Sequence, residues 1–179
     1  MRALFPLHFN MIQHIRNLMK PAKSFILAAA AALALAGCQS GSGKLASSSP
    51  ADLNGTAWAP VYVKGQENIA VPPADGSGFG KVFISFKESE KGMRVHGMSG
   101  NNLFNGGLNF ESDGEVEFTP MAVTMRMGPY PEYESRFLKA IDSTDIIVRD
   151  GDTLMFYDEE DGGGELLMKF SRTEMPEGR

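Results

Sequence analysis

The chain has 179 residues, with 17 Lys and Arg, 22 Asp and Glu, and one cysteine, Cys38. The part that follows Cys38 has a formal charge of 13 − 22 = −9, because four basic residues precede it: Arg2, Arg16, Lys20 and Lys23. This acidic balance argues against binding to nucleic acid and against a basic membrane-surface patch. About 140 residues remain after Cys38, which suits one domain of ordinary size that must fold without a disulfide.

The N-terminal region has the three parts of a secretory signal. Residues 19–23 are basic, residues 24–34 are apolar, and Ala36 and Gly37 are small. The apolar run is shorter than the roughly 20 residues that a membrane-spanning helix needs. Because the signal is complete from Met19 onward, residues 1–18 are interpreted as an upstream extension, and we expect translation to start at Met19.

Residues 35–38, Leu-Ala-Gly-Cys, resemble the bacterial lipoprotein box at all four positions. The resemblance implies that residues 19–37 are removed by cleavage between Gly37 and Cys38. It also implies that the Cys38 thiol and the new amino terminus carry acyl chains, which together anchor a protein stably. By resemblance to the enterobacterial sorting rule for such lipoproteins, Gln39 in the next position implies the outer membrane and not the inner one. The alternative is an ordinary signal peptide with a chance cysteine.

Residues 38–52 contain the lipidated cysteine and a segment rich in Gly and Ser. Such a composition cannot bury enough apolar surface to order itself, so we expect a flexible linker. The folded domain is expected from Leu53 to Thr173, followed by a C-terminal tail over residues 174–179.

Alternation with period two predicts strands around residues 82–87, 115–118 and 165–172. In the last of these, Leu166, Met168 and Phe170 are expected to face the same way. Asp150-Gly151 predicts a tight hairpin turn between apolar runs at 146–148 and 154–156. Residues 161–164 predict the next turn, which makes the C-terminal part a meander.

One segment has the pattern of a helix. Pro131 suits a first helical position, and Tyr133, Phe137, Leu138 and Ile141 form an apolar stripe. At about ten residues this helix must pack on the sheet to be stable. The predicted fold class is therefore mainly β (α+β), a curved antiparallel sheet or partly open β-barrel with one short helix covering an opening.

Four segments, taken in order, resemble the META domain, the family of the heat-inducible lipoprotein HslJ. They are Leu-Asn-Gly-Thr-Ala-Trp at 53–58, Ser-Gly-Asn-Asn-Leu-Phe-Asn-Gly at 99–106, Ala-Val-Thr-Met-Arg-Met at 122–127, and the helix with Phe137-Leu138. The resemblance covers nearly the whole exported part. It implies an envelope protein with no established catalytic activity, in a family linked to heat shock, antibiotic tolerance or secretion.

The chain departs from the family pattern at two positions together. Members often have cysteines where this chain has Asn101 and Gly128. The paired absence is expected if the two positions normally bridge. Met125 and Arg126 also stand in exchanged order relative to the family motif.

The Gly- and Asn-rich segment 97–107 is a candidate ligand loop, with Asn101 and Asn102 as its polar residues. The alternative is a tight corner in which Asn102 caps the backbone. Thr124 and Arg126 could contact an anionic ligand, or they could mark a strand edge with Arg126 paired to an acid.

Other candidates have a plain structural alternative. His96 lacks a patterned partner for catalysis, and residues 158–161 lack the spacing of a calcium loop. Methionines can bind Cu(I), but they more often fill irregular cores. The five considered are Met93, Met98, Met121, Met125 and Met127. We therefore expect no metal, no cofactor and no catalytic residue.

These observations predict a non-catalytic, lipid-anchored protein of the bacterial envelope that binds an envelope protein or wall component and has a role in stress tolerance. The alternative is a periplasmic carrier, in which the half-barrel and helix enclose a small apolar ligand or lipid. A hydrolase would require His96 to converge with an acid and a nucleophile.

Overall fold

The computed structural model describes residues 48–175 apart from 78–79, 112–114 and 160–163. The predicted upstream extension, signal peptide, Cys38 and the linker up to residue 47 lie outside the described residues. So do residues 161–163 of the last predicted turn and the tail from residue 176. Within the described part, no helix is long and apolar enough to cross a membrane.

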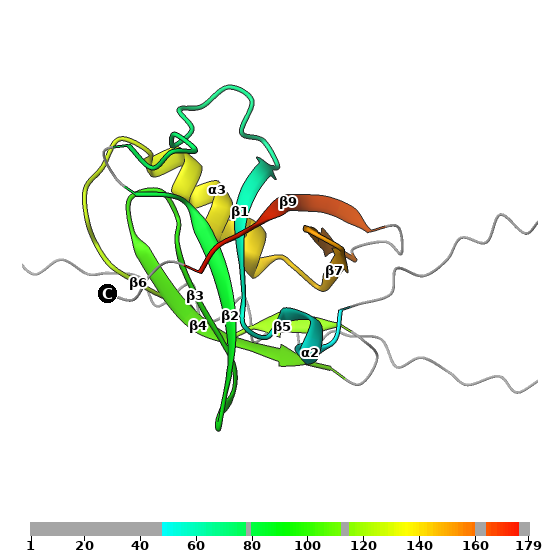
Figure 1. Cartoon of the computed structure of the whole chain (residues 1–179). Helices are drawn as coiled ribbons and strands as arrows, with labels where there is room; N and C mark the ends of the chain where they lie inside the picture. Colours follow the sequence, from blue (N-terminus) through cyan, green and yellow to red (C-terminus); the bar gives the residue numbers. More distant parts are fainter. Residues whose placement is uncertain (1–47, 78–79, 112–114, 160–163, 176–179) are drawn as a thin grey trace, which may run out of the picture. The chain divides into compact units, whose positions relative to one another are not determined.

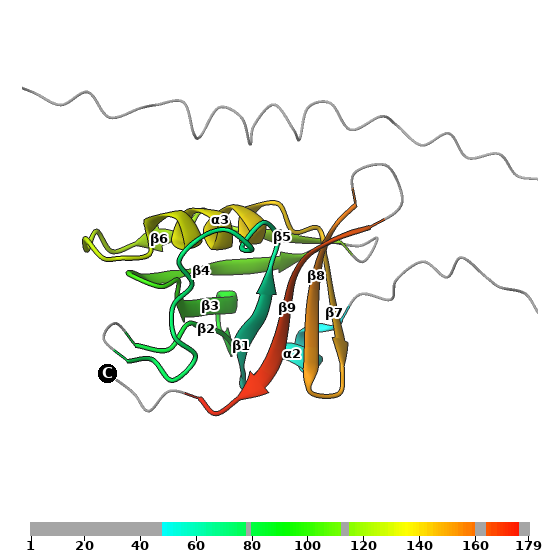
Figure 2. The same cartoon turned by 90° about the horizontal axis from the view of Figure 1, so that it is seen from above.

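The domain is built on one antiparallel sheet of nine strands (Figures 1 and 2). Its order is β5-β4-β3-β2-β1-β9-β8-β7. The short strand β6 is not part of this order and pairs with β4 at Phe104 and Asn105. Neighbours in sequence are mostly neighbours in space, as expected for hairpin connections. The strands are β1 (Thr56–Val63), β2 (Phe83–Ser89), β3 (Gly92–Met98), β4 (Leu103–Phe110), β5 (Val116–Phe118), β6 (Ala122–Val123), β7 (Ile146–Asp150), β8 (Thr153–Asp158) and β9 (Glu165–Thr173).

The sheet curls until its two ends approach each other. The Val116 N–H at the start of β5 donates to the Asp145 carbonyl, just before β7, at 2.8 Å. The rings of Phe118 and Phe156 pack at 5.7 Å between centroids on the inner face. The predicted fold class, a curved antiparallel sheet or half-barrel with a short helix, is confirmed.

Helix α3 (Pro131–Asp142) packs beside β4, as Figure 2 shows, and is 12 residues long. The Phe137 ring of this helix packs against the rings of Phe104 in β4 and Phe170 in β9, at 5.8 and 6.3 Å between centroids. The stripe predicted from the sequence is the buried face, although Leu138 lies at its half-buried rim. Burial also raises the pKa of the Tyr133 hydroxyl, because the ionised form would lose its hydration.

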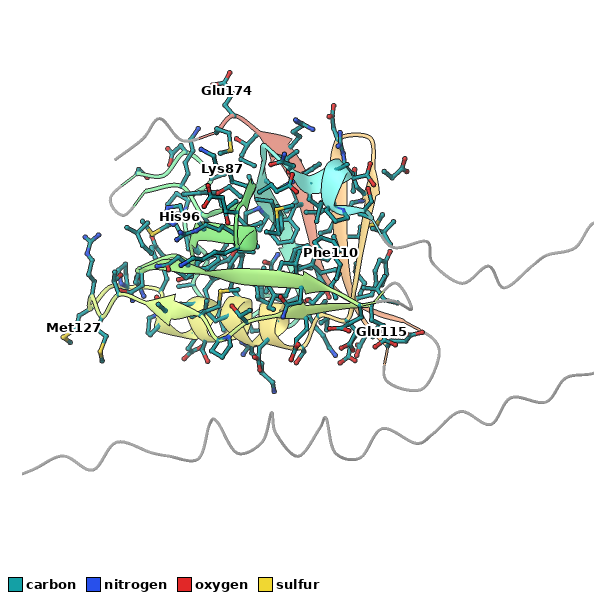
Figure 3. The ribbon with its side chains drawn as sticks, turned by 90° about the horizontal axis from the view of Figure 1, so that it is seen from below. Lys87, His96, Phe110, Glu115, Met127 and Glu174 are labelled. Carbon is teal, nitrogen blue, oxygen red and sulfur yellow. The ribbon has the colours of Figure 1, made fainter. Side chains whose placement is uncertain are left out.

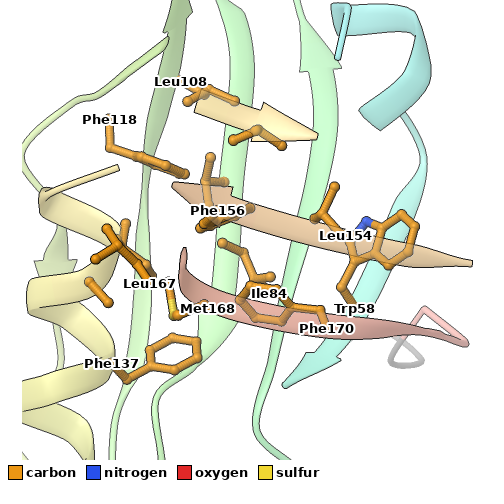
Figure 4. Packing of buried hydrophobic residues seen from close by; sticks show 14 of the residues in the cluster. Trp58, Ile84, Leu108, Phe118, Phe137, Leu154, Phe156, Leu167, Met168 and Phe170 are labelled. Carbon is orange, nitrogen blue, oxygen red and sulfur yellow. The ribbon is translucent and has the colours of Figure 1, made fainter. Parts of the chain in front are cut away.

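The interior of the half-barrel is filled by side chains (Figure 4). Phe156 and Phe170 pack at 4.9 Å between ring centroids, and Trp58 of β1 is fully buried. The Trp58 indole donates to the Thr56 hydroxyl at 2.7 Å, which satisfies its only polar group.

The N-terminal boundary of the domain differs from the prediction. The Ser48 N–H donates to the Ile147 carbonyl, and the Ser48 hydroxyl accepts from the Arg149 N–H, both at 2.7 Å. Residues Pro50–Leu53 then form the short helix α2, whose Leu53 is fully buried. Residues 48–52 therefore belong to the folded domain, because they cover the outer edge of β7 and deliver Leu53 to the core.

A bulge in β9 changes which leucine is buried. Tyr157 pairs with Leu166, but Phe156 pairs with Met168, so Leu167 is the extra residue. Leu167 is 5% exposed while Leu166 is only half-buried. The expectation that Leu166 shares the buried face with Met168 is wrong, because the insertion shifts the alternation by one residue at that point.

The predicted hairpin between β7 and β8 is confirmed, with its turn one residue later. Asp150 pairs with Thr153, so Gly151 and Asp152 are the central residues. Gly151 has φ = 57°, a left-handed conformation that favours glycine. β8 and β9 are also paired, so the C-terminal meander is present.

Candidate functional site

The four predicted ligand-loop residues come together where the turn between β3 and β4 meets the segment that leads into α3. Asn102 lies at the centre and is 7% exposed. Its Oδ1 accepts from the Thr124 hydroxyl at 2.9 Å and from the Arg126 N–H at 2.6 Å. Its Nδ2 donates to the Arg126 carbonyl at 3.1 Å and to the Glu134 carboxylate at 2.9 Å. We call this set of bonds the Asn102 clamp.

The clamp extends the β-ladder between β4 and β6 into the loop. The Thr124 N–H donates to the Leu103 carbonyl at 3.0 Å, and the Leu103 N–H donates to the Thr124 hydroxyl at 3.1 Å. The Asn102 carbonyl in turn accepts from the N–H and the hydroxyl of the buried Ser99. Both sides of the corner are therefore held by hydrogen bonds to backbone groups.

Asn101 and Gly128 are in direct contact. A Cβ atom added to Gly128 would lie 2.1 Å from the Asn101 Oδ1 and 3.0 Å from the Asn101 Cβ. The Asn101 Oδ1 also accepts from the Tyr130 N–H at 3.2 Å. The two positions at which the family resemblance implies a cysteine pair are thus adjacent in space. In this chain the buried side chain of Asn101 packs against Gly128 instead of forming a disulfide.

Glu134 is the part of the clamp that the sequence analysis missed. It lies in the first turn of α3, and its carboxylate binds Asn102 across 32 positions of sequence. An acidic residue in a first turn is already explained by the helix dipole, so its sequence position did not single it out. Through Glu134 the helix, the corner and the loop are joined at one amide.

The geometry gives Asn102 a structural role. Both of its N–H groups and both acceptor sites of its oxygen are used within the protein, which is the full capacity of an amide. A ligand could bind Asn102 only by replacing one of these bonds. Binding at Asn101, Asn102, Thr124 and Arg126 remains a prediction, whereas the alternative of a tight corner describes the observed bonds.

The loop held by the clamp has three consecutive residues with exposed side chains: Met125, Arg126 and Met127. We call these three residues the methionine tip. The side chains of Met125 and Met127 are 90% and 98% exposed, so these two methionines do not fill the core. Figure 3 shows Met127 at the end of the loop, directed away from the domain. Arg126 is exposed and forms no ion pair with any residue of the described part, so the alternative of pairing with an acid is not seen there.

The remaining candidates do not converge on a reactive centre. His96 is exposed on β3 (Figure 3). Its ring and the Phe83 ring pack edge to face at 5.8 Å between centroids. Over residues 48–175 with their gaps, no three His, Cys, Asp or Glu side chains are grouped to hold a metal ion. Of the predicted acidic turn 158–161, residues 160 and 161 lie outside the described residues.

The comparison with protein families decides what kind of domain this is. A model of the META domain matches residues 51–171. The chain belongs to the META domain family. The match begins two residues before the predicted boundary at Leu53, within helix α2.

Solved structures with the same fold are distant in sequence. A protein from Burkholderia xenovorans, solved by NMR, has a TM-score of 0.53 at 18% identity over 80% of this chain and 100% of that chain. A second NMR structure has a TM-score of 0.51 at 17% identity over 69% of this chain and 94% of the other. At these identities the likeness concerns the fold alone. A search of curated proteins found no match.

Proposed function

We propose that this META domain protein is a non-catalytic, lipid-anchored protein of the bacterial cell envelope. It is anchored in the outer membrane and binds another envelope protein through its surface. A contribution to envelope stress tolerance belongs to the same proposal, and it is supported by the family resemblance. The observation that carries the binding mode is the filled half-barrel together with the exposed apolar side chains at one corner.

A filled interior favours surface binding over the carriage of a small apolar ligand. A carrier of this fold needs an enclosed apolar cavity between sheet and helix. That space is occupied by Phe104, Phe137, Phe156 and Phe170, whose rings pack on one another. One hollow of about 650 Å³ in the described part lies outside the core at the end of β9 and is lined partly by charged residues such as Arg172.

The methionine tip and the adjacent Leu103 supply the surface. Leu103 is 39% exposed, and its backbone pairs with Thr124, directly before Met125. Methionine side chains adapt to irregular partner surfaces. Arg126 adds a positive charge to this apolar group, and it forms no ion pair among the described residues. Because the clamp already fixes the loop backbone, little ordering entropy remains to be lost on binding. A protein with an acidic rim around an apolar depression fits this surface.

The anchoring part of the proposal rests on residues 35–38 and sets a limit on reach. Ser48, the first residue that the structure describes, is ten residues after Cys38. A chain of that length spans at most about 36 Å when fully extended. A lipidated protein of this design would act on partners close to the bilayer surface.

Anchoring is tested by Cys38→Ser in cells fed labelled palmitate. We expect the unchanged protein to incorporate label and to sediment with membranes, and the variant to do neither. A variant that remains in the membrane fraction contradicts the lipoprotein assignment. The mass of the precursor that accumulates when signal peptidase is blocked shows whether translation starts at Met1 or Met19.

Binding is tested by photo-crosslinking in cells, with the reactive residue placed at Leu103, Met125 or Met127. A matched control carries it at Asp150, the exposed last residue of β7. We expect one envelope protein to be captured from the three corner positions and not from Asp150. Equal capture from Asp150, or no capture from a lipidated and folded protein, argues against binding at this corner.

A further inference from the structure

The methionines of the folded domain differ widely in access to solvent. Met125 and Met127 are 90% and 98% exposed, whereas Met93 and Met168 are 6% and 0% exposed. Met175, at 45%, lies between these groups. A thioether reacts with an oxidant that reaches its sulfur, so reactivity follows this exposure. The two sulfurs of the tip are therefore the most accessible of these five.

The Asn102 clamp keeps the tip exposed. Asn102 binds the backbone N–H and carbonyl of Arg126, the residue between the two methionines. The loop is also fixed on either side, through Thr124 and through the packing of Gly128 on Asn101. None of these contacts uses a methionine side chain. A chemical change at either sulfur therefore leaves the clamp intact.

We propose that Met125 and Met127 are a modification site, at which peroxide or hypochlorous acid forms methionine sulfoxides without unfolding the domain. With hydrogen peroxide, a sulfur lone pair attacks one peroxide oxygen and forms the S–O bond. The O–O bond breaks, and the second oxygen leaves as water after proton transfer. The sulfur is oxidised by two electrons and the peroxide is reduced. Exposed sulfoxides are also accessible to methionine sulfoxide reductases, which reverse the change with thiol reductants.

The modification changes the chemistry of the tip. A sulfoxide is polar, so oxidation converts two exposed apolar side chains into polar ones on an unchanged scaffold. If the tip contacts a partner, this would weaken apolar contact there, a consequence that rests on the proposed function. The modification itself does not depend on any partner, so the two are tested separately.

The test is oxidation of the purified full-length protein in detergent with graded hydrogen peroxide, followed by tryptic digestion and mass spectrometry. Cleavage after Arg126 puts Met125 and Met127 in different peptides. We expect both to be oxidised at least about tenfold faster than Met93 and Met168. The melting temperature should stay the same after the first two oxygen atoms are added, and methionine sulfoxide reductases A and B should restore the mass.

Two controls separate access from intrinsic reactivity. In urea-unfolded protein the rates of all methionines should become similar. The variant Met125→Leu/Met127→Leu should fold normally and lose the rapid uptake of oxygen.

Oxidation of Met168 as fast as Met127 in the folded protein overturns the proposal. So does a fall in melting temperature that accompanies the first two oxygen atoms, or failure of both reductases to act. Loss of partner capture after oxidation would be scored apart from these results.

Discussion

Replacing the contact between Asn101 and Gly128 by a covalent bond tests the geometry of the corner. We consider Asn101→Cys/Gly128→Cys in the chain from residue 39 onward, which lacks Cys38. The positions are 128 − 101 = 27 apart in sequence. Closing a loop of this length removes unfolded-state entropy equivalent to about 3.5 kcal/mol at 25 °C.

Native-state strain reduces this gain. The Cβ built on Gly128 lies 3.0 Å from the Asn101 Cβ, whereas bridged cysteines have Cβ atoms about 3.5–4.5 Å apart. The loop must move outward by roughly 0.5 Å at least, so we expect a net gain of about 2–3 kcal/mol. The hydrogen bond from the Tyr130 N–H to Asn101 is lost in both redox states, and its cost cancels when these are compared.

The assay is urea unfolding of the double variant with and without reductant, after mass spectrometry has verified the bridge. We expect a higher midpoint for the oxidised form. The matched control, Asn101→Ser/Gly128→Ser, should not respond to reductant. An absence of the bridge after equilibration in a glutathione redox buffer, or an oxidised form less stable than the reduced one, would refute the inferred proximity of the two side chains.

Three further substitutions test the clamp, the helix face and a buried hydroxyl. Asn102→Ala should lower the unfolding free energy by about 2–4 kcal/mol, because backbone groups of Arg126 lose their partners; a urea midpoint equal to that of the unchanged protein would contradict the clamp. Phe137→Ala should cost about 3–5 kcal/mol in the same assay, and Leu138→Ala at the half-buried rim clearly less. Since the folded-state pKa of Tyr133 is raised, its contribution is complete below the unfolded value of about 10 and is lost as pH rises above it. Tyr133→Phe should therefore flatten the fall of the urea midpoint at alkaline pH, and an unchanged pH profile would contradict this.

The regular parts of the fold could be predicted from the sequence because their signals are redundant. Alternation and turn residues together predicted β2, β5, β7, β8 and β9, and the stripe around Phe137 predicted α3. The bulge could not be seen, because Leu166, Leu167 and Met168 are all apolar and any alternation fits them. The order of residues 48–52 was hidden by their linker-like composition. A local sign of order in this segment is Asp52 placed three residues after Ser49. The Asp52 carboxylate accepts hydrogen bonds from the Ser49 N–H and hydroxyl at the start of α2.

The candidate site could be predicted as a set of residues but not as a function. The motifs placed Asn101, Asn102, Thr124 and Arg126 on two segments that the fold brings together. Sequence alone could not show that Asn102 uses its whole hydrogen-bonding capacity internally, since this depends on distances to Arg126 and Glu134. The exposure of the tip methionines was also hidden, because methionine is usually a core residue.

The way the sheet ends bears on the protein's tendency to self-associate. An exposed outer strand is a template for pairing with another copy, and lipid anchoring would concentrate copies in two dimensions. Here Ser48 covers the outer edge of β7 with two hydrogen bonds, and the contact between Val116 and Asp145 joins β5 to the other end of the sheet. β6 has only two residues. Little continuous strand edge is therefore left among the described residues to template edge-to-edge pairing between copies.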